Sequence, residues 1–92
     1  MELRKYEEKI RKQIDTTTHP RDRMIDAGLA MIEHTGQINK DIKRITYEIE
    51  EIKTKEEKEN IIEETKENMK KVLDDIIKIA ETMQIKIIDL LD

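Results

Sequence analysis

The chain has 92 residues, of which 36% are apolar and 43% are charged, and its formal charge is −4. This length allows one domain covering residues 1–92, and the apolar share lies below the roughly 45–50% of an average globular chain. A monomer would have a thin core, which favours long helices that oligomerise. The absence of Cys, Phe and Trp excludes disulfide scaffolds, thiolate nucleophiles and zinc fingers, and argues against base-stacking nucleic-acid modules.

A first helix is predicted over residues 2–15, where Leu3, Tyr6 and Ile10 recur at helical spacing. Three threonines and His19 then precede Pro20. Threonines are β-branched, and the residue before a proline is pushed out of the α region, so the helix is expected to break there. We expect His19 to be exposed and Pro20 to occupy the first turn of the next helix, where its missing N–H is not needed.

Two longer helices are predicted over residues 21–53 and 58–91, separated by a charged stretch without apolar residues that is expected to form a turn. Thr54 or Asn60 could cap the second of them. Its apolar face is wide, which indicates packing on two sides, against the preceding helix and against another subunit. In the helix predicted over residues 21–53, the apolar series runs through Ile25, Leu29, Ile32, Ile38, Ile42, Ile45, Ile49 and Ile52.

The patterning therefore predicts an all-α fold, a helical hairpin with a shorter leading helix, which assembles into a bundle as a homo-dimer or tetramer. No apolar run reaches the roughly 18 residues of a membrane span, so we expect a cytoplasmic protein with no membrane partner. Basic and acidic residues are interleaved and the net charge is negative, which argues against duplex nucleic acid as a partner.

Few residues stand out as candidates for chemistry. Gly28 and Gly36 each cost a helix about 1 kcal/mol relative to alanine. They indicate close helix–helix contact or, less favoured, a widened space beside a ligand. His34 is interpreted as a surface or interface residue, with catalysis as the lesser alternative. Asp74 and Asp75 interrupt an apolar run, and we expect one of them at the edge of a buried face, paired with a lysine of a neighbouring helix.

Two stretches, roughly residues 16–44 and 67–91, resemble the MazG-like nucleoside-triphosphate pyrophosphohydrolases, an all-α family. The first stretch matches the family's break before a helix that carries its Glu-Glu-x-x-Glu signature. In this chain that signature reads Glu33-His34-Thr35-Gly36-Gln37, so only the first acid is retained. The resemblance implies that the site lies on the two long helices and that its metal ligands are degenerate.

The family's second signature, Glu-x-x-Asp, falls on Asn68-Met69-Lys70-Lys71, where both acids are absent. A register moved by one turn would place Lys71 and Asp74 at the two signature positions and still leave the signature incomplete. Clustered carboxylates hold Mg²⁺ beside the substrate phosphates in such sites, and a lysine can neutralise a phosphate but cannot supply a metal-bound hydroxide.

The resemblance thus implies a pseudoenzyme that binds or sequesters a nucleotide or another phosphorylated small molecule without hydrolysing it and without a metal cofactor. A compact member of this kind fits a viral or mobile-element origin. Two alternatives stay open. One is a structural or protein-binding bundle that self-associates or binds a host partner. The other is an active Mg²⁺-dependent pyrophosphohydrolase that uses Glu33, His34, Asp74 and Asp75. The nucleotide-binding residues implied by the resemblance are Glu33, His34, Gln37, Lys40, Asn68 and Lys71.

Overall fold

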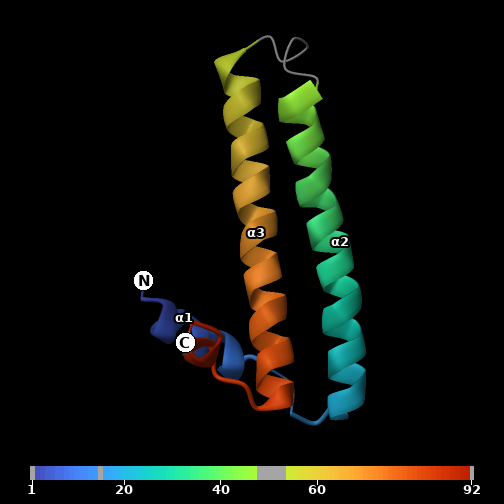
Figure 1. Cartoon of the computed structure of the whole chain (residues 1–92), viewed down its shortest axis with the longest axis vertical. Helices are drawn as coiled ribbons and strands as arrows, with labels where there is room; N and C mark the ends of the chain where they lie inside the picture. The colour runs from blue at the N-terminus through green and yellow to red at the C-terminus, as the bar shows by residue number, and fades with distance from the viewer. Residues whose placement is uncertain (1, 15, 48–53, 92) are drawn as a thin grey trace.

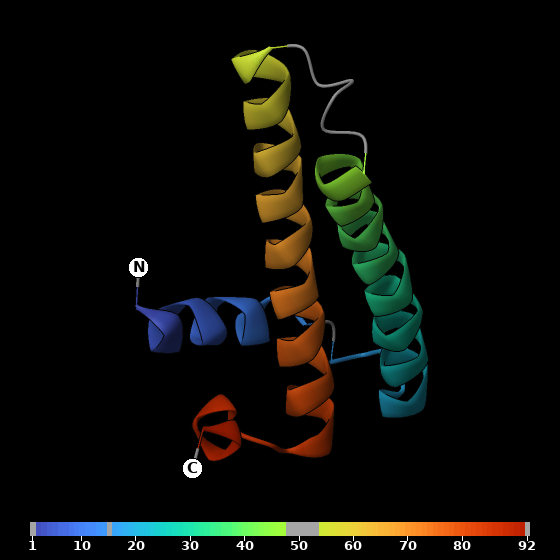
Figure 2. The same ribbon diagram turned by 45° about the horizontal axis from the view of Figure 1, so that its top comes forward.

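A computed structural model of the chain describes residues 2–14, 16–47 and 54–91, and these ranges contain helices and no strand. The helices are α1 (Leu3–Lys12), α2 (Pro20–Tyr47), α3 (Lys55–Met83) and the short 3-10 helix η2 (Ile87–Leu90). The long helices α2 and α3 form an antiparallel hairpin, and α1 and η2 lie on the side of α3 away from α2 (Figures 1 and 2). The predicted all-α hairpin with a shorter leading helix is confirmed.

Each long helix begins beside a side chain that accepts a hydrogen bond from the backbone of its first turn. The exposed His19 precedes α2, and its Nδ1 accepts a hydrogen bond of 3.0 Å from the backbone N–H of Arg21, while Pro20 occupies the first turn as predicted. Thr54 caps α3, since its hydroxyl accepts a 3.1 Å hydrogen bond from the N–H of Glu57.

Two predicted helix boundaries differ from the structure around α3. The helix begins at Lys55 and not at residue 58, because acidic side chains in a first turn are favoured by the helix dipole even where no apolar residue packs. It ends at Met83 and not at residue 91, because Gln84 adopts a left-handed conformation with φ 61° and ψ 35°. The predicted end of the preceding helix, residues 48–53 with Ile49 and Ile52, lies outside the described residues.

The apolar core lies at the foot of the molecule, between α1, α3 and η2. Its buried members are Ile10, Ile77, Ala80 and Ile87, of which Ile77 is fully buried. Arg11 of α1 adds polar contacts to the end of α3 and the residues after it. Its guanidinium pairs with Glu81 and donates a 2.8 Å hydrogen bond to the backbone oxygen of Ile85. α1 is therefore fastened to the end of α3 by apolar packing and by an ion pair.

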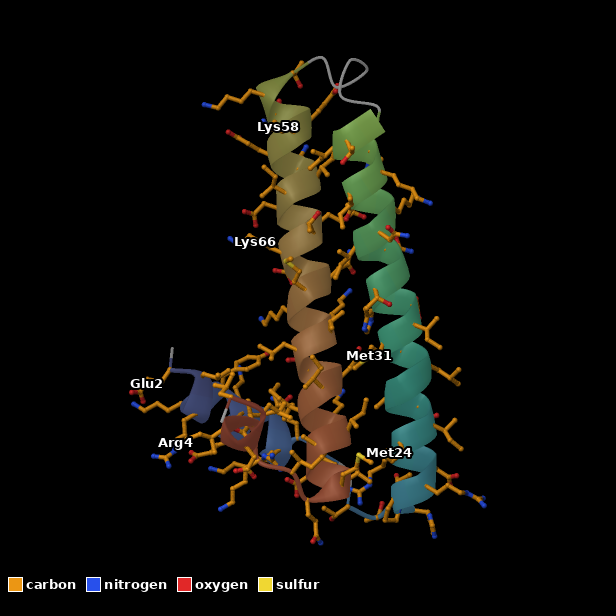
Figure 3. All side chains as sticks on the ribbon, in the orientation of Figure 1. Glu2, Arg4, Met24, Met31, Lys58 and Lys66 are labelled. Atoms are coloured by element: carbon orange, nitrogen blue, oxygen red, sulfur yellow. The ribbon has the colours of Figure 1, made fainter. Side chains whose placement is uncertain are left out.

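The interface between α2 and α3 is more polar than this core. Ala27 and Ile61 are buried there, but so are three polar side chains. Lys58 and Lys66, by contrast, project from α3 into solvent (Figure 3). The hairpin thus encloses a polar seam, defined by the buried residues Asp41, Asn68 and Asp75.

The attachment of α1 to α3 should make stability depend on pH in the alkaline range. The Tyr6 hydroxyl donates a hydrogen bond to the carboxylate of Asp74. Burial, followed by that hydrogen bond and the negative charges of Asp74 and Glu67, raises the pKa of Tyr6 from 10.0 to about 12. The unfolded chain therefore loses this proton at lower pH than the folded one, so the contribution is complete below pH 10 and is lost as the pH rises towards 12.

We expect the free energy of unfolding of the native sequence, measured with denaturant, to fall as the pH rises through this alkaline range. In the Tyr6→Phe variant this free energy should fall less steeply with pH. The difference between the two slopes isolates Tyr6, because Tyr47 is present in both proteins. Equal slopes would show that the Tyr6 hydroxyl ionises alike in the folded and unfolded states.

Candidate functional site

A cavity of about 310 Å³ opens between α2 and α3, midway along the hairpin. Glu33, His34 and Gln37 reach it from neighbouring positions on α2. Asn68 and Lys71 reach it from α3, where a separation of three residues places them on one face of the helix. The structure therefore brings together all the predicted nucleotide-binding residues except Lys40, which is exposed on α2 and does not line the cavity.

Two further residues, Glu64 and Glu67, line the same cavity and were not predicted. Both belong to the acid-rich first half of α3, whose side chains are mostly exposed. The signal was nevertheless in the sequence: Glu64 stands four residues before Asn68, and Glu67 stands four residues before Lys71. Residues at that separation share a helix face, so both glutamates follow the same two rows into the cavity.

His34 is held in place by a buried carboxylate. Its Nδ1 lies 2.6 Å from Oδ2 of Asp75, whose side chain is only 4% exposed. One of the two adjacent aspartates was expected at the edge of a buried face, and Asp74 is indeed only partly buried. The expected pairing with a lysine is wrong, because Asp75 lies against a histidine and Asp74 accepts the hydrogen bond from Tyr6. The interpretation of His34 as an interface residue is confirmed, since its ring lies between the two long helices.

A second polar contact crosses the seam on the other side of the cavity. Asp41 is 2% exposed, and its carboxylate lies 3.3 Å from the hydroxyl of Thr65. That hydroxyl also lies 2.8 Å from the backbone oxygen of Ile61, so its single proton serves two acceptors. The cavity is thus framed by two contacts between α2 and α3, one at His34 and one at Asp41.

The cavity lining carries an excess of negative charge. Three glutamates face Lys71, the one lysine among the lining residues, and Gln37 and Asn68 add amide donors and acceptors. Carboxylate and amide oxygens are the ligand type that Mg²⁺ prefers. Within the described ranges, however, no three Asp, Glu, His or Cys side chains converge closely enough to hold a metal ion. The described residues therefore do not form the carboxylate cluster of the resembled family.

The two glycines of α2 do not mark a close approach within the chain. A Cβ atom added at Gly28 or at Gly36 would meet nothing within 4 Å, so the interpretation of close helix–helix contact fails inside the described part of the molecule. The alternative of a widened space beside the ligand is not supported either, because neither glycine lines the cavity.

A second cavity, of about 350 Å³, lies at the foot of the hairpin. It is lined from both long helices and from the segment between α1 and α2, and Asp75 is one of its lining residues. Arg23 and Lys78 oppose Asp26 and Asp75 there, so its charges are balanced. Apart from Asp75, none of the residues singled out from the sequence reaches it.

Comparison with protein-family models, curated proteins and solved structures finds no match to this chain. The resemblance to MazG-like pyrophosphohydrolases therefore stays a prediction based on the residues quoted above. None of the described helices is long and apolar enough to cross a membrane.

Proposed function

We propose that the cavity between α2 and α3 binds a nucleotide without hydrolysing it. The observation that carries this proposal is that Glu33, His34, Gln37, Asn68 and Lys71, chosen from two distant stretches of sequence, line a single cavity. The absence of a convergent carboxylate cluster among the described residues supports binding in preference to metal-dependent hydrolysis.

Each lining residue has a role that follows from its chemistry. Lys71 supplies a positive charge for a phosphate group, and the amide of Asn68 can donate a hydrogen bond beside it. Glu33 and Gln37 offer acceptors for the hydroxyl groups of a ribose or the exocyclic amine of a base. His34, oriented by Asp75, provides a ring that the ligand meets in a fixed position.

The size and charge of the cavity restrict the ligand further. A volume of about 310 Å³ lies at the lower end of the range for small-molecule pockets, so the cavity encloses part of a nucleotide and leaves the rest in solvent. Three glutamates against one lysine disfavour a chain of phosphates. We therefore expect nucleosides and nucleoside monophosphates to bind more tightly than the corresponding triphosphates.

The test is a thermal-shift panel of nucleosides and their mono-, di- and triphosphates, each measured with Mg²⁺ and with a chelator. A ligand at about 100 times its Kd stabilises the folded state by about 2.7 kcal/mol, which gives a readily measured shift in Tm. We expect a shift that persists in the chelator and that Lys71→Glu abolishes for the phosphorylated ligands.

Lys70→Glu is the matched control, because Lys70 is the exposed neighbour of Lys71 and does not line the cavity. An equal loss of the Tm shift in both variants would show that the shift depends on net charge and not on the position of Lys71. A shift that requires Mg²⁺ would favour the pyrophosphohydrolase alternative, and the absence of any shift would overturn nucleotide binding.

Self-association is a second candidate function, favoured by the surface area of the chain. A folded monomer of 11.0 kDa exposes about 5,600 Å² by the usual scaling with mass, whereas this chain exposes 7331 Å². Several large apolar side chains are more than half exposed, among them Ile25, Leu29 and Ile32. We propose that the chain forms a homo-oligomer in which part of this surface is buried.

A further inference from the structure

The outer face of α2 carries an apolar stripe that no other part of the described chain covers. Ile25, Leu29 and Ile32 follow one another at separations of four and three residues, which places them on one face of the helix. They are 52%, 62% and 70% exposed, respectively. The opposite face of α2 carries His34 and Asp41 and packs against α3, so the more apolar face of this half of the helix is the one that points away from the hairpin.

We propose that this stripe, defined by Ile25, Leu29 and Ile32, packs against the same stripe of a second copy of the chain, with the two α2 helices antiparallel. The inference rests on the proposed self-association and is independent of nucleotide binding. It names the surface that is buried and the orientation of the two copies.

The area argues for a second copy as the occupant. Stable interfaces bury about 800 Å² on each partner, and the chain exposes about 1,700 Å² more than a folded monomer of its mass. One helix-to-helix interface therefore accounts for about half of the excess. At Gly28 and Gly36, which lie along the same face, there is open space beside the backbone.

The charges beside the stripe argue for the antiparallel orientation. Asp22 and Asp26 are exposed near the start of α2, and Lys40 and Lys43 are exposed near its end. Arg21 lies 3.8 Å from Asp22 and offsets only one of the two acids. An antiparallel pair places the acidic end of one helix beside the basic end of the other and also opposes their dipoles, whereas a parallel pair would place like charges together.

The face is tested by sedimentation of the full chain at several concentrations. We expect the native protein to sediment with twice the mass of the 11.0 kDa chain and Ile32→Glu to weaken the association at least tenfold. Ile32 is 70% exposed, so the variant should keep its fold, which circular dichroism checks. Met69→Glu is the matched control. Met69 is 56% exposed on α3, away from the stripe, so this variant should associate as the native chain does.

The orientation is tested with spin labels, since the chain contains no cysteine of its own. Asp22→Cys and Lys40→Cys are labelled separately and mixed. Antiparallel copies packed stripe on stripe bring the two different labels within about 7 Å of each other along the helix axis, whereas two labels at position 22 stand about 20 Å apart.

Each outcome bears on a different part of the inference. A monomeric native chain would overturn self-association itself. An oligomer that Ile32→Glu leaves intact would overturn the assignment of this face, and two labels at position 22 found close together would overturn the antiparallel orientation.

Discussion

Replacement of Ile77 by alanine is expected to lower the free energy of unfolding by about 2–5 kcal/mol, the range found for buried isoleucine and leucine. Ile77 is 0% exposed and belongs to the small core that joins α1, α3 and η2. The rest of that core consists of Ile10, Ala80 and Ile87 with partly buried neighbours, so little surrounding material can collapse into the space that the shortened side chain leaves.

Denaturant unfolding measures this loss, and Ile62→Ala is its control on the same helix. Ile62 is 43% exposed, so its truncation should cost much less than that of Ile77. Amide hydrogen exchange adds a spatial readout: protection should fall first in α1 and η2, which Ile77 fastens to α3. Equal losses for the two variants, or a loss of protection spread evenly over the hairpin, would contradict the placement of the core.

The foot of the molecule and the hairpin above it are thus stabilised by different interactions. The foot, where α1 and η2 meet α3, depends on apolar burial around Ile77 and on the ion pair between Arg11 and Glu81. The hairpin above it depends on contacts across the polar seam. Polar contacts fix which groups face each other and contribute less net stability than apolar packing. The seam is therefore suited to position a site, and the foot to stabilise the fold.

The sequence predicted two long helices, and it predicted the start of each more closely than the end of α3. Pro20 and Thr54 are residues whose chemistry favours the beginning of a helix, and both lie where α2 and α3 begin. The end of α3 was missed because the apolar spacing continues beyond Met83 and because Gln84 adopts the left-handed conformation in which glycine or asparagine is more usual.

The apolar series of α2 also indicates that its apolar residues lie on two different faces of the helix. Ile25, Leu29 and Ile32 continue into Ile38 and Ile45 as though they formed one stripe. The step from Ile32 to Ile38 is six residues, which turns the helix by about 240° and moves the series to another face. Accordingly Ile32 is 70% exposed while Ile38 and Ile45 are only partly exposed.

The sequence predicted some of the residues that line the candidate cavity and missed others. Its residues on α2 and α3 were chosen from the family resemblance, and that choice brought out Asn68 and Lys71 but passed over Glu64 and Glu67, which sit one turn earlier. The pairing of His34 with Asp75 joins residues 41 positions apart, and no local pattern fixes such a contact before the helices are placed side by side.

Asp75→Ala is expected to lower the free energy of unfolding by about 1–3 kcal/mol, the usual cost when a buried group loses its hydrogen-bond partner. Asp75 is buried and its Oδ2 lies 2.6 Å from Nδ1 of His34. Glu63→Ala is the control, because Glu63 is an exposed acid on the same helix and should change stability by less than about 0.5 kcal/mol.

A double-mutant cycle with His34→Ala separates this contact from the other effects of truncation. If the two side chains stabilise the hairpin through each other, the double variant should lose less than the sum of the single losses, by about 0.5–3 kcal/mol. High salt should change this coupling little, because the carboxylate is shielded from solvent. Additive losses would show that Asp75 and His34 contribute separately. The ring of His34 would then be held at the cavity by packing alone, and nucleotide binding should survive Asp75→Ala.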